Sequence, residues 1–125
     1  MTRKLLEWLP AVAWAGVIFA LSSQSSLPGP SDQTADFAFK KVLHVIAYGI
    51  LALLLLFPNR KRDRSYLIAF VIAVLYAGSD EFHQSFVPER EGTLRDVGID
   101  SFAAGLALLL TWWNLRKLKE WLGFL

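Results

Sequence analysis

Four long apolar stretches alternate with short polar segments along the chain. They cover residues 5–22, 33–57, 65–85 and 94–113. A helix needs about 20 apolar residues to cross the hydrocarbon core of a bilayer. The pattern therefore predicts an all-α integral membrane protein, built as a small bundle of four transmembrane helices.

The polar segments contain signals for the ends of these helices. Pro28-Gly29-Pro30 prevents a continuous helix between the first two stretches. Ser31 or Asp32 is suited to cap the start of the second helix, and Pro58 is expected to end it. A short basic tail, residues 114–125, follows the fourth stretch.

The composition agrees with a membrane protein of one domain, residues 1–125. Hydrophobic residues make up 54% of the chain and charged residues 19%, and the charges are clustered between the apolar stretches. The net charge of +2 is not arranged as a basic stripe interleaved with aromatic residues, so nucleic acid is not an expected partner. The chain has no cysteine, which excludes disulfides and thiolate chemistry.

The basic residues predict how the helices are oriented in the cell membrane. Nine of them would lie on one side: Arg3, Lys4, Arg60, Lys61, Arg62, Arg64, Arg116, Lys117 and Lys119. The acids are concentrated on the other side, where Glu89 and Glu91 belong to the segment before the fourth helix. The positive-inside rule then places both termini in the cytoplasm.

Ionisable residues occur at similar depths in three of the predicted helices. At about 1.5 Å per residue they lie about 18 to 25 Å above the cytoplasmic boundary. Helical spacing places them in one polar stripe per helix: Lys41, His44 and Tyr48; Asp80, His83 and Gln84; Asp96 and Asp100. Lipid cannot satisfy such groups, so the stripes are expected to face one another around a pocket open to the outside.

Two kinds of chemistry fit these residue types. Asp80, His83, Asp96 and Asp100 are candidate ligands of a divalent metal, with His44 as a further donor. Alternatively, Asp80 or Asp100 orients His83 or His44 as a general base or nucleophile. A purely structural alternative is a set of hydrogen bonds that holds the helices in register.

Three basic residues lie near these acids in the predicted bundle, and two roles are open for them. Lys41, Arg90 and Arg95 could bind the phosphate or carboxylate of a lipid headgroup. Alternatively they neutralise the acids, with Arg90 or Arg95 paired to Asp96 and Lys41 paired to Asp80 or Asp100.

The remaining candidates have less specific expectations. Tyr48 is either a donor at the floor of the pocket or an interhelical hydroxyl. Glu81 lies about 100° from Asp80 around its helix, so it is expected to face the headgroups. Gly78 and Gly105 are expected to allow close approach of helices.

Several motifs resemble the VanZ-like family of small membrane proteins. They are Lys41-x-x-His44-x-x-x-Tyr48, the Ser79–Gln84 segment with Phe86-Val87-Pro88-x-Arg90, and Asp96-Val97-x-x-Asp100. The Ser22-Ser23-Gln24 end of the first helix is also similar to that family. The resemblance implies a possible link to glycopeptide resistance, because the family's namesake is associated with resistance to teicoplanin. It implies no particular reaction.

Two functions remain open at this point. The pocket could hydrolyse or transfer the headgroup or phosphate of an amphiphilic lipid. Alternatively, the chain is a non-catalytic membrane module that binds a lipid, a lipid-linked cell-wall precursor or a lipophilic glycopeptide. Transport is less well supported, because four helices without paired repeats would need a homodimer to form a pathway.

Overall fold

The computed structural model describes residues 3–24, 29, 31–88, 90 and 92–124, and within these residues the fold is entirely helical. The helices are α1 (Arg3–Ser22), α2 (Gln33–Asn59), α3 (Ser65–Gln84) and α4 (Leu94–Phe124). Each of the four predicted apolar stretches thus forms one helix. Pro28 and Pro30 of the predicted break, and the acids Glu89 and Glu91, lie outside the described residues.

The start of α2 agrees with the sequence signal, but its end does not. The Asp32 carboxylate accepts the Ala35 N–H at 2.9 Å and caps the helix. The expected stop at Pro58 is wrong, because α2 continues to Asn59. A proline removes only one backbone donor, and side chains satisfy carbonyl groups of the last turn: Asn59 Nδ2 donates to Leu55 O at 2.8 Å.

The fourth helix is longer than the predicted span of residues 94–113. It continues without interruption through the basic tail to Phe124. Residues 114–122 contain neither proline nor glycine, so helix propensity favours continuation. An Arg116–Glu120 pair at 3.3 Å adds a contact one turn apart along this part of the helix.

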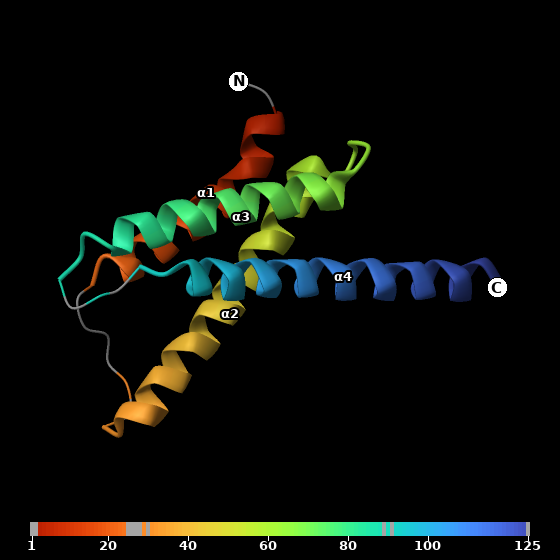
Figure 1. The fold of residues 1–125 in the computed structure, drawn as a ribbon. Coiled ribbons are helices and arrows are strands. Elements are labelled where there is room, and N and C mark those ends of the chain that lie inside the picture. The colour runs from red at the N-terminus through yellow and green to blue at the C-terminus, as the bar shows by residue number, and fades with distance from the viewer. Residues whose placement is uncertain (1–2, 25–28, 30, 89, 91, 125) are drawn as a thin grey trace.

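The helices meet at one side of the molecule. Figure 1 shows the C-terminal ends of α1 and α3 gathered on the left with the N-terminal end of α4, and α2 also begins on that side. On the right, α4 extends beyond the other helices. This arrangement brings together the helix ends that carry the predicted polar stripes.

Small side chains form the contact between α3 and its neighbours. Ala69, Ala73 and Ala77 follow one face of α3 at intervals of four residues and are fully buried, as is Ala104 of α4. Small residues allow helix backbones to approach closely, which is typical of packing in membranes. The buried centre of the bundle is therefore apolar and tightly packed.

Gly78 and Gly105, both expected to permit close packing of helices, differ in how near their neighbours lie. A Cβ added at Gly105 would lie 3.2 Å from Phe70 Cε2, so close approach at Gly105 is confirmed. At Gly78 a Cβ would meet no atom within 4 Å, and the expectation for this residue is wrong. The neighbouring helix contacts α3 through its alanine face, from which Gly78 points away.

The first helix is attached to α2 and α3 by side-chain hydrogen bonds to backbone carbonyls. Trp14 Nε1 donates to Ala47 O at 2.9 Å, and the Tyr76 hydroxyl donates to Ala15 O at 2.5 Å. Within the part of the chain that the structure describes, α1 does not contact α4. The first helix therefore covers one side of the bundle.

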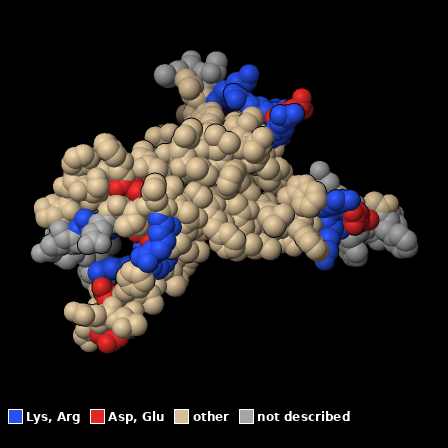
Figure 2. Space-filling view, viewed as in Figure 1, with Lys and Arg blue, Asp and Glu red and all other residues tan. Residues whose placement is uncertain are grey.

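The exterior of the bundle is apolar between its charged ends. Large apolar side chains are exposed on every helix, including Leu75 at 68% and Phe102 at 72%. Figure 2 shows Lys, Arg, Asp and Glu side chains at the extremities, with a broad band of other residues between them. By length and composition, α1, α2 and α3 can each cross a membrane.

Candidate functional site

Three side chains of α2 each contact a carboxylate on another helix. Lys41 donates to Asp96 of α4, His44 Nδ1 lies 3.4 Å from Asp100 Oδ1 of α4, and the Tyr48 hydroxyl donates to Asp80 Oδ2 of α3 at 2.9 Å. The structure thus brings the stripe of α2 against those of α3 and α4.

A second set of hydrogen bonds joins this cluster to α1. Gln84 Nε2 donates to Asp80 Oδ2 at 3.3 Å and to Ser22 Oγ at 3.2 Å. All three residues are buried. Asp80 therefore receives donors from both Tyr48 and Gln84 on the same carboxylate oxygen, and its role in the structure is to join α2, α3 and the end of α1.

Glu81 faces into the bundle and not toward headgroups. Its residue is only 4% exposed, and its Oε2 accepts the Thr93 N–H at 3.3 Å. Ligand atoms of Glu81, His44 and Asp100 lie within 4.8 Å of one another. The expected outward orientation is wrong because the segment leading into α4 packs against this face of α3.

His83 lies apart from the other candidate residues. Its Nε2 is 3.0 Å from Ser23 Oγ, and its ring stacks on Phe19 of α1 with 4.4 Å between centroids. The predicted pairing of Asp80 with His83 is therefore not formed. Three residues of separation rotate His83 about 60° around α3 from Asp80, which is enough to turn it toward α1.

The four residues predicted to bind a metal are separated in the structure, and His83 is turned toward α1. Asp80, His83, Asp96 and Asp100 do not converge on one point in the described part of the chain. The residues that do converge are His44, Glu81 and Asp100, one from each of α2, α3 and α4.

Among the described residues, Lys41 pairs with an acid, whereas the expected pairing of Arg90 or Arg95 with Asp96 is not formed. Lys41 pairs with Asp96 and not with Asp80 or Asp100. Arg90 donates through Nε to Gln24 O at 2.6 Å and through its guanidinium to Leu21 O at 3.3 Å. Arg90 therefore binds one carbonyl of the last turn of α1 and one just beyond its end, where a cation also interacts favourably with the helix dipole.

One further ion pair at the site was not predicted. Lys40 pairs with Asp36 at 2.7 Å, one turn earlier on α2. The spacing of four residues between opposite charges is a signal that sequence inspection could have used. It would not have shown that both side chains line a cavity.

A polar cavity of about 310 Å³ opens among these residues. Its charged lining contains both signs: Asp36, Lys40, Lys41, Glu81, Arg90, Arg95 and Asp96, with His44, Gln84 and Thr93 also present. Four of these side chains are Lys or Arg and three are acids. The cavity is therefore suited to an anion held by several donors.

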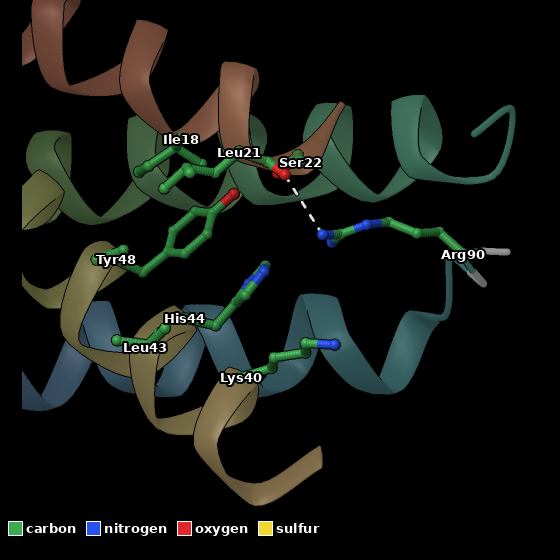
Figure 3. A pocket seen from close by; sticks show the side chains of 9 residues that line it. Ile18, Leu21, Ser22, Lys40, Leu43, His44, Tyr48 and Arg90 are labelled. Atoms are coloured by element: carbon green, nitrogen blue, oxygen red, sulfur yellow. Dashed lines mark hydrogen bonds between the residues drawn. The ribbon is translucent and has the colours of Figure 1, made fainter. Parts of the chain in front are cut away.

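An apolar crevice of about 80 Å³ lies beside this cavity, between α1 and α2. Lys40, His44 and Arg90 line both spaces. In Figure 3 these three side chains lie below the end of α1, and the dashed line marks the bond from Arg90 to α1. Polar and apolar surfaces thus adjoin, as an amphiphilic ligand requires.

Comparison with known proteins agrees with the motifs. The sequence model of the VanZ/LLP1 family matches residues 3–116, a range that contains every candidate residue described above. No curated protein and no solved structure matches the chain. Because the match covers nearly all of its length, the chain belongs to the VanZ/LLP1 family.

Proposed function

We propose that this protein crosses the cell membrane four times and binds a phosphate-bearing amphiphilic lipid at the outer leaflet. The observation that carries this proposal is the polar cavity adjoining the apolar crevice, with Lys40, His44 and Arg90 shared between them. The headgroup would occupy the cavity and part of an acyl or polyprenyl chain the crevice. A lipid-linked cell-wall precursor has this combination of phosphate and long apolar chain.

The pairing of charges supports an anionic headgroup. Lys40 and Lys41 are each bonded to a carboxylate, whereas Arg90 is bonded to backbone carbonyls. Arg95 lines the cavity and forms no ion pair with any described residue. A phosphate bound by these two guanidinium groups would be held by charge-assisted hydrogen bonds, which are stronger than neutral ones.

The proposed orientation places the cavity outside and both termini in the cytoplasm. The fourth span is the part of α4 between Val97 and Trp113, in which Asp100 is the only charged residue. The Arg60–Arg64 segment joins α2 to α3 at the upper right of Figure 1 and the basic end of α4 lies at the right, whereas the ends of α3 and α4 that line the cavity lie on the left. An excess of Lys and Arg is typical of cytoplasmic segments.

Single cysteines test the orientation directly, because the chain has none of its own. Ser31→Cys is expected to react with a membrane-impermeant maleimide in intact cells, since residue 31 precedes α2 on the cavity side. Arg62→Cys, in the segment between α2 and α3, is expected to react only after lysis. The unmodified chain controls for background labelling, and the reverse pattern would contradict the orientation.

Lipid binding tests the proposal itself. In neutral nanodiscs, the protein is expected to retain phosphatidic acid or a polyprenyl phosphate in preference to phosphatidylcholine, as measured by native mass spectrometry. Arg95→Gln should weaken this binding by about tenfold, since a charge-assisted hydrogen bond contributes about 1.5 kcal/mol or more.

Arg62→Gln provides the matched control, because it removes the same charge at a position outside the cavity. It is expected to leave the affinity unchanged. Equal weakening in both variants would indicate attraction to the overall charge of the protein, and equal retention of all lipids would contradict the proposal.

A catalytic function on the same lipid is the second candidate. The specific observation that favours it is the His44–Asp100 contact beside the cavity, since a carboxylate on one ring nitrogen orients the other for proton transfer. Release of phosphate or headgroup in the binding assay would support a hydrolase or transferase. Binding without turnover would support the non-catalytic module.

A further inference from the structure

Side chains of three helices converge beside the polar cavity, which two of them also line. His44 comes from α2, Glu81 from α3 and Asp100 from α4, and their ligand atoms lie within 4.8 Å of one another. Glu81 is 4% exposed and Asp100 is 1% exposed. One imidazole and two carboxyl groups therefore meet at a point where both acids are buried and the imidazole is partly exposed.

The negative charge in this region has no lysine or arginine partner. Asp80, Glu81 and Asp100 are all buried, and none of them forms an ion pair with a Lys or Arg among the described residues. Lys41 is bound to Asp96. His44 lies 3.4 Å from Asp100 as an ionisable partner, so three buried carboxyl groups share one imidazole. Buried carboxyl groups with so few partners are unfavourable.

The buried carboxylates also retain unused acceptor atoms. Asp100 Oδ2 and Asp80 Oδ1 are inaccessible to solvent and accept no hydrogen bond from any described residue. Buried polar atoms without a partner are uncommon and indicate a role beyond packing. Here they add unused acceptor atoms to a cluster in which carboxyl groups outnumber basic partners.

We propose that His44, Glu81 and Asp100 bind one divalent transition-metal ion, Zn²⁺ or Mn²⁺. Imidazole nitrogen with carboxylate oxygen is a ligand set suited to these ions, whereas Mg²⁺ and Ca²⁺ favour oxygen alone. His44 and Glu81 also line the cavity, so the remaining coordination positions face it. This set shares Asp100 with the predicted set of Asp80, His83, Asp96 and Asp100, and His44 is the further donor expected there. Glu81 is the ligand that the sequence did not predict.

The distance between His44 and Asp100 agrees with joint coordination. Nδ1 and Oδ1 are 3.4 Å apart, at the long end for a hydrogen bond. Two donors at about 2.1 Å from one tetrahedral ion are themselves about 3.4 Å apart. The nearest ligand atom of Glu81 lies within 4.8 Å of those of His44 and Asp100. The site requires no bound lipid, so it does not depend on the proposed lipid function.

Metal analysis of the full-length protein in detergent tests this site. The protein is stripped with a chelator, reloaded with Zn²⁺ or Mn²⁺, passed through a desalting column and measured by inductively coupled plasma mass spectrometry. We expect close to one equivalent in the unmodified chain and at least a tenfold loss of affinity in His44→Gln and Asp100→Asn. Reloading should also raise the melting temperature of the unmodified protein but not of these variants.

His83→Ala is the matched control, because it removes the other histidine, which contacts Ser23 outside the cluster. It is expected to retain metal and the melting shift. Failure of the unmodified chain to retain either ion, or equal loss in His83→Ala and His44→Gln, would overturn the proposal. If His44→Gln does not fold, the unmodified chain and His83→Ala still decide the outcome. No lipid is added, so the result is separate from the lipid-binding test.

Discussion

Replacing Gly92 by alanine is expected to destabilise the protein by about 1–3 kcal/mol, because the added Cβ would force the backbone to shift. A Cβ at this position would lie 2.2 Å from the carbonyl oxygen of Glu81 and 3.2 Å from Ser85 Cβ. The closest atom belongs to the backbone of α3, which cannot yield as a flexible side chain can. The segment leading into α4 would have to move away from α3.

This displacement would also affect the candidate site. Gly92 precedes Thr93, whose N–H donates to Glu81 Oε2 at 3.3 Å and whose hydroxyl accepts the Asp96 N–H at 3.2 Å. Moving the segment would weaken both bonds and shift the start of α4. We therefore expect Gly92→Ala to reduce the proposed binding of metal as well as stability.

Gly98→Ala is the control for this prediction, because a Cβ there would meet no atom within 4 Å. Alanine is favoured over glycine inside a helix by about 0.5–1 kcal/mol, so this variant should be as stable as the unmodified protein or more stable. Denaturant unfolding in detergent, followed by tryptophan fluorescence, measures both. Equal midpoints for the two variants would contradict the close contact at Gly92.

The number and positions of the helices could be predicted because the signals are local. Apolar stretches long enough to cross a bilayer specify helices without reference to the rest of the chain. The C-terminal ends of α2 and α4 are harder to predict. Residues 114–122 have high helix propensity, and the Asn59 side chain bonds a carbonyl of the last turn of α2 after Pro58. The α2 stripe was found correctly because three- and four-residue spacing fixes the positions of Lys41, His44 and Tyr48 on one face.

The partners of each polar residue could not be predicted in the same way. Glu81 and His83 are both near Asp80 on α3, and the choice of which one joins the cluster depends on which helix covers each face. The loop into α4 covers Glu81, whereas α1 covers His83. The depth of Lys41 in the membrane is similar to that of several acids, so depth does not identify its partner. The packing of α2 against α4 makes Asp96 the partner.

Removing Lys41 is expected to have a large effect, because it leaves Asp96 without its cation. The two side chains are 28% and 11% exposed and join α2 to α4. Breaking a fully buried pair costs about 3–5 kcal/mol; partial exposure of this pair reduces the expected loss in Lys41→Met to about 2–3 kcal/mol. Unfolding in detergent measures the loss.

A double-mutant cycle separates the pair from the packing of the two side chains. Asp96→Asn in the Lys41→Met background removes the unpaired charge. The stability lost in Lys41→Met/Asp96→Asn should therefore be smaller, by about 1–3 kcal/mol, than the sum of the losses in the two single variants. The exposed Arg116–Glu120 pair is the control, and Arg116→Met should change stability by less than about 0.5 kcal/mol. Additive losses at Lys41 and Asp96 would show that their ion pair does not couple α2 to α4. A coupling confined to Lys41 and Asp96 would instead establish that charge pairing, in addition to the alanine contacts, sets the position of α4 beside the cavity.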